Sequence, residues 1–286
     1  MSFTNFLPVS VVIPTLGGNH LSNTINFINT GDTIPYEILI CIPKEYLHTI
    51  DFKLSNNVIL IPTEKKGQVY QRSIGFSSAK SEFILQLDDD LKLTSKDIII
   101  LIEELNKKEN KSCIGPQFYN QSLKQFCYLS PKGFNKFESY LIEYFIGGAN
   151  WGRNRLGTIS KSGHNFGFDI NYMINYTEKV EWLAGGCILH RKSNLILEDY
   201  FPFSGKAYCE DLMHSILLRK NHVNLYITKR VICELNSLVG NDTLVQKLQE
   251  KTAIEYTVHL MNGSMPRYII RNIYWSIRYH IKAFLH

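Results

Sequence analysis

The chain has 286 residues, 44% of them hydrophobic, which allows a substantial buried core and excludes a globally disordered protein. The formal net charge of +5 is a modest excess and does not indicate nucleic-acid binding, which needs a dense basic stripe. The 6 cysteines include no C-x-x-C pair, which argues against a zinc site or a disulfide framework and fits a reducing compartment.

Short apolar runs alternate with helical patterns in the first half of the chain. Asn19 is expected to cap the first helix, and Thr94 with Asp97 matches a capping box. Predicted strands lie at residues 9–13, 37–42, 58–61 and 83–87, and predicted helices at 19–29, 68–78 and 94–107. Nearly continuous apolar strands that alternate with helices indicate a parallel sheet covered on both faces.

The second half is less regular. Residues 117–178 are rich in Gly, Asn, Tyr and Phe and read as a long irregular stretch, which in a compact domain usually has a function. Regular structure is predicted to return at residues 180–191, followed by a helix at 211–220, strands at 225–227 and 230–233, and helices at 242–261 and from 266 onward.

The N-terminal segment lacks the basic and long apolar parts of a secretory signal peptide. No run of about 18 apolar residues predicts a membrane-spanning helix. We therefore expect a cytoplasmic protein, with peripheral contact at the cytoplasmic face of the inner membrane left open.

Three aspartates, Asp88, Asp89 and Asp90, directly follow the apolar strand at residues 83–87. Adjacent carboxylates repel each other unless a cation lies between them, and Mg²⁺ and Mn²⁺ prefer such oxygen ligands. In open α/β sheets, ligands bind just past the carboxyl ends of the strands. Taken alone, the triplet is equally compatible with a solvated turn or an acidic helix N-terminus.

Four segments in order resemble the family 2 glycosyltransferases, which have the GT-A fold. They are Val9–Thr15, Gly67–Gly75 leading into the aspartates, Trp182–Cys187, and Tyr208–Leu212. Each segment is weak evidence, but four at sensible spacing are fairly specific. The resemblance implies an α/β GT-A fold with a mixed, mainly parallel sheet flanked by helices, and a C-terminal helical extension.

The resemblance also implies a domain organisation. Residues 1–240 would form the catalytic domain, with a donor-binding half at about 1–116 and an acceptor-binding half at about 117–240. Residues 241–286 would form the helical extension.

The resemblance assigns roles to the acidic residues. Asp90 would ligate Mn²⁺ or Mg²⁺, and Asp88 would face the metal or the nucleoside. Asp89 would touch the ribose, and a solvated or helix-facing carboxylate is an equally good alternative for it. Asp211 would be the general base that takes the proton of the acceptor hydroxyl, and Glu210 would assist it or bind the acceptor. Simple capping of a helix N-terminus is the alternative for the last two.

The donor site is expected to combine several elements. Pro14 and Thr15 would cradle the nucleoside, and Arg72 would reach the base or the phosphates. The alternative for Arg72 is an ordinary charge on a helix surface. Gly185 and Gly186 would let the backbone approach the donor sugar closely.

Trp182 is expected to stack on a sugar ring of the acceptor, although a structural tryptophan in the core is a nearly equal alternative. Glu234 is the candidate for a third metal ligand, because it occupies the position where many relatives have a histidine. A surface role is equally compatible with Glu234.

The donor's nucleobase is not fixed by the sequence. Relatives usually have acidic residues after the second strand, one of which reads uracil, whereas this chain has Ile42–Pro43 there. A UDP-sugar stays the default donor, and a dTDP- or GDP-sugar is open.

The predicted function is an inverting, metal-dependent transfer of a sugar from a nucleotide-diphosphate sugar to a saccharide or lipid-linked saccharide, in bacterial surface polysaccharide synthesis. A sugar-phosphate nucleotidyltransferase is disfavoured because residues 16–19 lack a cation. A non-catalytic nucleotide-sugar or glycan-binding module is disfavoured by the intact Asp88, Asp90 and Asp211. The oligomeric state is left open.

The last helix has an apolar and a basic stripe, which suits an anionic membrane surface. Packing of the apolar stripe on the catalytic domain, with solvated basic residues, is the alternative. The apolar residues are Ile270, Ile273, Ile277, Ile281 and Phe284. The basic residues are Arg267, Arg271, Arg278 and Lys282.

Overall fold

The computed structural model describes residues 5–130, 133–151, 155–236 and 243–284. The strands are β1 (Asn5–Pro14), β2 (Thr33–Pro43), β3 (Val58–Thr63), β4 (Phe83–Leu87), β5 (Leu91–Lys92), β6 (Ser112–Asn120), β7 (Gln125–Phe126), β8 (Thr177–Val180), β9 (Cys187–Arg191) and β10 (Asn224–Leu235). The α-helices are α1 (Asn19–Ile28), α2 (Gln68–Ser78), α3 (Ser95–Asn106), α4 (Gly133–Phe145), α5 (Glu210–Lys220), α6 (Leu244–Leu260) and α7 (Met265–Phe284).

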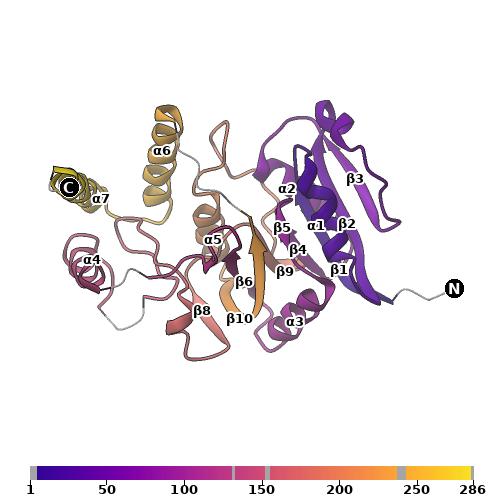
Figure 1. Ribbon diagram of the computed structural model, residues 1–286, viewed down its shortest axis with the longest axis horizontal. Helices are drawn as coiled ribbons and strands as arrows, with labels where there is room; N and C mark the ends of the chain where they lie inside the picture. Colours follow the sequence, from indigo (N-terminus) through magenta and orange to yellow (C-terminus); the bar gives the residue numbers. More distant parts are fainter. Residues whose placement is uncertain (1–4, 131–132, 152–154, 237–242, 285–286) are drawn as a thin grey trace.

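One mixed sheet runs through the molecule in the strand order β3-β2-β1-β4-β9-β6-β10-β5 (Figure 1). The strands from β3 to β4 pair in parallel, β9 is antiparallel to both β4 and β6, and β6 is parallel to β10. Parallel neighbours need a crossover connection, and α1 lies in the one between β1 and β2. The connection between β2 and β3, residues 44–57, contains a short 3-10 helix and no α-helix. The predicted mixed α/β architecture, with a central sheet flanked by helices, is confirmed.

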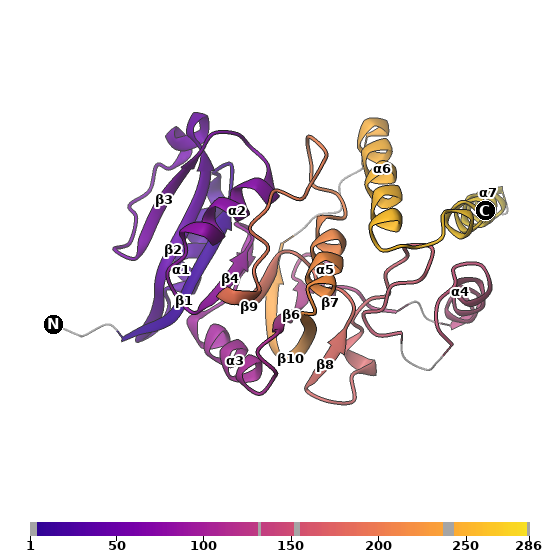
Figure 2. The same cartoon turned by 180° about the vertical axis from the view of Figure 1, so that it is seen from behind.

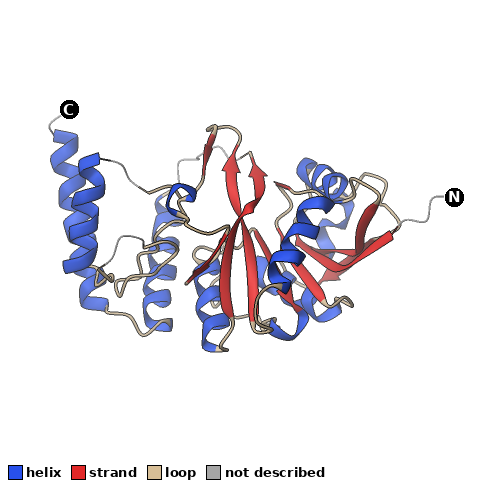
Figure 3. Cartoon of the chain, turned by 90° about the horizontal axis from the view of Figure 1, so that it is seen from below, coloured by secondary structure: helices blue, strands red, loops and turns tan. Residues whose placement is uncertain are grey.

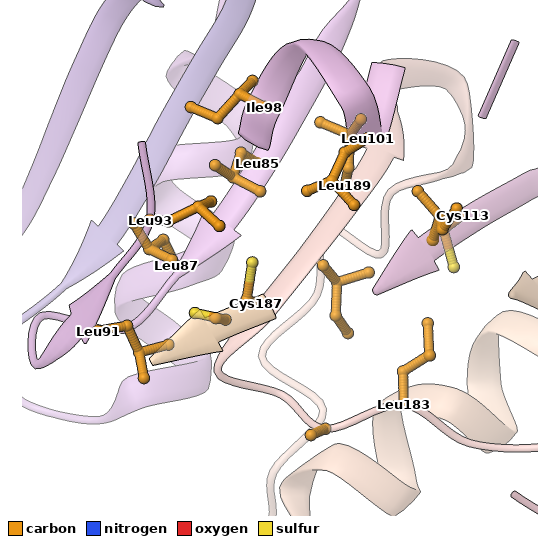
Figure 4. Close-up of a cluster of buried hydrophobic side chains, with 14 of the residues drawn as sticks. Leu85, Leu87, Leu91, Leu93, Ile98, Leu101, Cys113, Leu183, Cys187 and Leu189 are labelled. Carbon is orange, nitrogen blue, oxygen red and sulfur yellow. The ribbon is translucent and has the colours of Figure 1, made fainter. Parts of the chain in front are cut away.

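Helices cover both faces of this sheet (Figures 1 and 2). The side chains of α1 and α3 join one buried cluster with alternate residues of β1, β2 and β4, while Phe76 of α2 packs against the opposite face with Val12 and Leu39. Figure 4 shows Ile98 and Leu101 of α3 above the strand residues Leu85 and Leu189. Burial on both faces explains why these strands read as continuous apolar runs.

Local patterns located several elements correctly. The predicted helix at residues 68–78 and the strand at residues 83–87 coincide with α2 and β4. The capping box is confirmed, because the Asp97 N–H donates to Thr94 Oγ1 and the Thr94 N–H donates to Asp97 Oδ2 at 2.9 Å. The predicted cap at Asn19 is wrong, since Gly18, with φ of 131°, is the N-cap and its conformation suits glycine.

The second half is more regular than predicted. Residues 133–145 form the helix α4 inside the stretch expected to be irregular. The two strands expected at residues 225–227 and 230–233 are one strand, β10, with a register shift after Thr228. A bulge of this kind interrupts the alternation of inward and outward side chains from which a strand is predicted.

The C-terminal helices lie at the end of the molecule opposite β3 (Figure 1), and Figure 3 shows α7 lying alongside α4. Arg271 Nε donates to Glu143 Oε1 at 2.6 Å, and Arg278 Nε donates to Glu138 Oε1 at 2.6 Å. Both glutamates belong to α4, so Arg271 and Arg278 of the basic stripe face protein.

The apolar stripe of α7 therefore points outward. Ile269, Ile270, Ile273 and Ile277 are each more than half exposed. Because Arg271 and Arg278 are paired with glutamates, these two side chains are neither solvated nor free for an anionic surface, and this part of both expectations needs correction. Asp242 and the side chains of Ile281, Lys282 and Phe284 lie outside the described residues.

Candidate active site

The site lies at the edge of the sheet where β1 and β4 end. Strand β9 runs antiparallel to β4, so the residues that precede β9 meet the residues that follow β4. The Asp88 N–H donates to the Gly186 carbonyl at 2.8 Å. Helices α2 and α5 contribute Arg72 and Glu210, whose side chains meet at this edge. Chain segments that are far apart in sequence are thereby brought to one place.

An open cleft of about 790 Å³ lies at this edge. Its walls are the end of β1, the start of α2, the aspartate triplet and the segment at residues 199–207. Pro14 and Thr15 line it, as predicted for a nucleoside cradle, and the Gln71 side chain donates to the Thr15 carbonyl at 2.8 Å. A cleft of this size accommodates a small organic ligand.

The three aspartates have different environments. Asp88 Oδ1 accepts hydrogen bonds from Arg72 Nη2 at 2.7 Å and from Gln68 Nε2 at 3.0 Å. The Thr15 hydroxyl donates to Asp89 Oδ2, which joins the triplet to the end of β1. Asp90 is the exposed member of the triplet and lines the cleft.

Burial raises the pKa of Asp88, although the Arg72 guanidinium opposes this rise. Burial also raises the pKa of Asp90, and the negative charge of Asp88 adds to that effect. These carboxylates lack enough positive charge from the protein, and a bound cation would supply it. The side chains present therefore fit a divalent metal.

Within the part of the chain that the structure describes, no cluster of at least three acidic, histidine or cysteine side chains could by itself hold a metal. Magnesium-type sites often use only one or two carboxylates together with substrate phosphates and water, so Asp88 and Asp90 suffice. Glu234 was expected to be a third metal ligand. In the structure its Oε2 is 2.9 Å from Lys92 Nζ, so this carboxylate forms an ion pair with Lys92.

Glu210 and Asp211 open helix α5. The N-cap of α5 is Cys209, which makes no side-chain cap hydrogen bond, while the Leu212 N–H donates to Asp211 Oδ1 at 2.8 Å within the first turn. Burial and then the nearby Glu210 charge raise the pKa of Asp211 to about 7. A carboxylate with a pKa near neutrality is suited to accept a proton, so its place in the first turn of α5 is compatible with general-base chemistry.

Arg72 differs from both expectations. Its side chain is 3% exposed, so it is not a surface charge, and it is absent from the walls of the cleft. Its guanidinium donates from Nη1 to Glu210 Oε1 at 2.8 Å and from Nη2 to Asp88 Oδ1 at 2.7 Å. The expected contact of Arg72 with the donor is replaced in this structure by contacts with two carboxylates.

Gly185 and Gly186 serve close packing of side chains. A Cβ atom on Gly185 would collide with Glu210 Oε1, and one on Gly186 would lie 3.2 Å from Asp88 Oδ2. Neither glycine lines the cleft. Their expected neighbour was the donor sugar, but their neighbours in the structure are the carboxylates of Glu210 and Asp88.

The predicted acceptor contact of Trp182 needs correction. Trp182 is 1% exposed, its Nε1–H donates to the Phe166 carbonyl at 2.8 Å, and its ring lies 4.3 Å from that of Phe168. A side chain enclosed in this way cannot stack on a sugar, and the alternative of a core tryptophan is the correct one.

The sequence interpretation missed three lysines of the cleft, Lys65, Lys66 and Lys206. Lys65 Nζ is 3.0 Å from Asp199 Oδ2, which joins the start of α2 to the segment at residues 199–207. Cations beside a helix N-terminus suit a phosphate-bearing ligand. The sequence contained a signal for two of these lysines, because Lys65 and Lys66 lie between a predicted strand and a predicted helix.

The mixed sheet, the helices on both its faces and the acidic edge are those of an α/β protein of the GT-A fold class. The sequence matches the family described as glycosyl transferase family 2 over residues 10–170, more than half of its length. The chain belongs to this family. No curated protein matches the sequence.

A structural relative supports the fold. The crystal structure of GalNAc-T7 with UDP, GalNAc and Mn²⁺ superposes with a TM-score of 0.56 at 15% sequence identity. The match covers 87% of this chain and 48% of that chain, so the present chain spans about half the length of GalNAc-T7.

Proposed function

We propose that this protein transfers a sugar from a nucleoside diphosphate sugar to a hydroxyl group of a saccharide or lipid-linked saccharide. The observation that carries the proposal is the acidic triplet in a lysine-bearing cleft, together with Asp211 at the start of α5. Family membership and the UDP and Mn²⁺ of the GalNAc-T7 structure support it.

In the proposed reaction the cleft binds the donor. Thr15 and Pro14 contact the nucleoside, and Lys65, Lys66 and Lys206 attract the diphosphate. Asp90 and Asp88 would hold a divalent cation, Mn²⁺ or Mg²⁺, which would neutralise charge on the departing diphosphate. Asp89 also lines the cleft and is proposed to contact the ribose, with its Oδ2 held by the Thr15 hydroxyl.

Asp211 is proposed as the base. Its ionised carboxylate accepts the proton of the acceptor hydroxyl while that oxygen attacks the anomeric carbon and the diphosphate leaves. One displacement of this kind inverts the configuration at the anomeric carbon. Glu210, which is held by Arg72 and by the Tyr200 hydroxyl at 3.3 Å, keeps Asp211 in a negatively charged environment.

The finer assignments follow from the sequence and from the family. A UDP-sugar is the proposed donor, with dTDP- and GDP-sugars as outcomes of the assay. The proposed product is a bacterial surface glycan, made in the cytoplasm. The division into a catalytic domain at residues 1–240 and an extension at 241–286 also stays a proposal.

The decisive experiment incubates the purified protein with a panel of nucleotide sugars and Mn²⁺, and measures the released products. We expect a nucleoside diphosphate from one donor, and loss of this release when EDTA removes the metal. Formation of pyrophosphate from a sugar phosphate and a nucleoside triphosphate would favour nucleotidyl transfer. Tight donor binding without any turnover would favour a binding module.

We also propose that the outward face of α7 rests on the membrane surface. Among the described helices, none is long and apolar enough to span a bilayer. Ile269, Ile270, Ile273 and Ile277 nevertheless form one exposed apolar stripe, and Trp151 near α4 is 63% exposed. An amphipathic helix with nearby aromatic rings is suited to the membrane interface, where a lipid-linked acceptor would be found.

A further inference from the structure

The side chain of Arg72 connects two parts of the site, the aspartates after β4 and the acidic pair at the start of α5. It is separated from Asp88 by 16 residues and from Glu210 by 138 residues, yet it donates to both at 2.7 and 2.8 Å. Its Nη2 also donates to the Gly185 carbonyl at 3.2 Å, so the loop before β9 is held by the same group.

This arrangement depends on the shape of the guanidinium. Arginine has a planar group with several N–H donors in fixed directions, so one side chain can bridge two carboxylates and a carbonyl. A lysine ammonium is a point charge on a flexible stem and cannot reproduce the planar bridge. The role therefore requires arginine and not merely a positive charge.

The electrostatic situation makes the bridge necessary. Asp88 and Glu210 both lie within 2.8 Å of the Arg72 guanidinium, which is 3% exposed, and Asp211 follows Glu210 directly in the chain. Opposing burial, the charges of Glu210 and Asp88 raise the pKa of Arg72, so it stays charged. Removing one partner from such a buried group leaves the others uncompensated and free to move.

Neighbouring residues are fitted to the same bridge. Gln68 lies one helical turn before Arg72 on α2 and donates to the same oxygen of Asp88 at 3.0 Å. The Tyr200 hydroxyl donates to the second oxygen of Glu210 at 3.3 Å. Gly185 leaves the room that Glu210 Oε1 occupies. Each carboxylate is thus fixed by the bridge and by one further donor.

We propose that Arg72 is a positioning residue that couples the donor end of the site, at Asp88, to the acceptor end, at Glu210 and Asp211. This inference rests on the proposed glycosyl transfer. A substitution at Arg72 would then act on catalysis through the placement of other groups and not through a lost contact with the donor.

The test is a double-mutant cycle with Arg72→Met and Glu210→Gln, using the donor that the wild-type protein cleaves. Arg72→Met is expected to lower kcat about 100-fold with the donor KM changed less than about threefold. Arg72→Lys is expected to recover about tenfold of this loss, since it restores the charge but not the bridge. The double variant is expected to be no slower than Arg72→Met alone.

Arg230→Met is the matched control, because Arg230 Nη1 donates to Glu104 Oε1 at 2.7 Å outside the site. This variant should keep wild-type kcat and KM. If Arg72→Met does not fold, judged by thermal unfolding, Arg72→Lys closes the same cycle with Glu210→Gln.

A large rise in donor KM with unchanged kcat would overturn the proposal in favour of a direct donor contact. Independent, multiplicative losses in the double variant would also overturn it. A wild-type protein without turnover would instead refute the proposed function and this inference with it, which distinguishes the two failures.

Discussion

Two carboxylates of this site, Asp90 and Asp211, lie in different environments. Asp90 is exposed in the cleft, where a cation and phosphates have access, while Asp211 is partly buried at the start of α5 with a pKa raised to about 7 by burial and Glu210. The first is suited to ligate a metal and the second to accept a proton. Their substitution should therefore produce different defects.

Asp211→Asn is expected to lower glycosyl transfer at least about 100-fold, because the amide cannot accept the proton of the acceptor hydroxyl. The Leu212 N–H can still donate to the amide oxygen, so the helix start is retained. Donor binding, measured as a thermal shift with UDP and Mn²⁺, should persist in this variant and be lost in Asp90→Ala. Near-normal turnover by Asp211→Asn would show that another group is the base.

The raised pKa of Asp211 also predicts a stability effect. The ordinary value is 3.8 and the folded value is about 7, so the unfolded chain loses its proton first as the pH rises between them. The folded state is therefore progressively destabilised over this range, by about 1.4 kcal/mol for each unit of pKa difference. Asp211→Asn should raise the thermal unfolding temperature at pH 8 and raise it less at pH 5.

Glu104→Gln is the control with the opposite sign. Although burial opposes it, hydrogen bonds from Lys107, Thr177 and Arg230 lower the pKa of Glu104 to about 2. The stabilisation from ionised Glu104 is present above pH 4.5 and is lost as the pH falls through about 2, so Glu104→Gln should lower the unfolding temperature at pH 8. Equal shifts for both variants would contradict the assigned environments.

Helix starts contribute to this protein in two ways. The N-terminal parts of α2 and α5 place Arg72 and the Glu210–Asp211 pair at the site. The start of α3 contributes only to the stability of the fold. Helix α3 packs Ile98 and Leu101 into the core with the strands, and its capping box fixes where it begins. The cap of α3 can therefore be changed without touching the chemistry.

Thr94→Ala should lower the free energy of unfolding by about 1 kcal/mol, since the Asp97 N–H loses its partner at the helix start. Thr94→Ser keeps the hydroxyl and should behave like the wild type. Urea unfolding measures both, and the kcat of the folded variants should be unchanged. A loss of activity without a loss of stability would mean that α3 takes part in the site.

The whole molecule is elongated along its sheet, with β3, β2 and β1 at one end and the pair α4 and α7 at the other (Figure 1). Because Arg271 and Arg278 pair with glutamates of α4, the exposed face of α7 is apolar and not basic. Attachment to a membrane would then depend on apolar burial more than on anionic lipid, and salt would weaken it little.

The full chain is expected to sediment with phosphatidylcholine vesicles at both low and high salt. The double variant Ile273→Glu with Ile277→Glu should stay in the supernatant, because it places carboxylates on the apolar face. Ile59→Glu, on β3 at the other end of the molecule, should sediment like the wild type. A wild-type protein that stays in the supernatant would refute the membrane proposal.

The local patterns were enough for the first half of the fold and for the acidic part of the site. Continuous apolar runs identified the strands, and the aspartates directly after residues 83–87 are set by their place in the chain. These features involve neighbours in sequence, so no knowledge of distant contacts is needed. The helix α4 was missed because it has few buried positions. One of them is Glu143, whose burial depends on its ion pair with the distant Arg271.

Contacts between distant segments could not be read from the chain. Arg72 was expected to meet the donor and Trp182 a sugar, but folding enclosed the first between Asp88 and Glu210 and the second among aromatic side chains. Which stripe of α7 faces outward likewise depended on the glutamates of α4. A side chain's chemistry is fixed by its type, whereas its partners are fixed only when segments remote in sequence pack together.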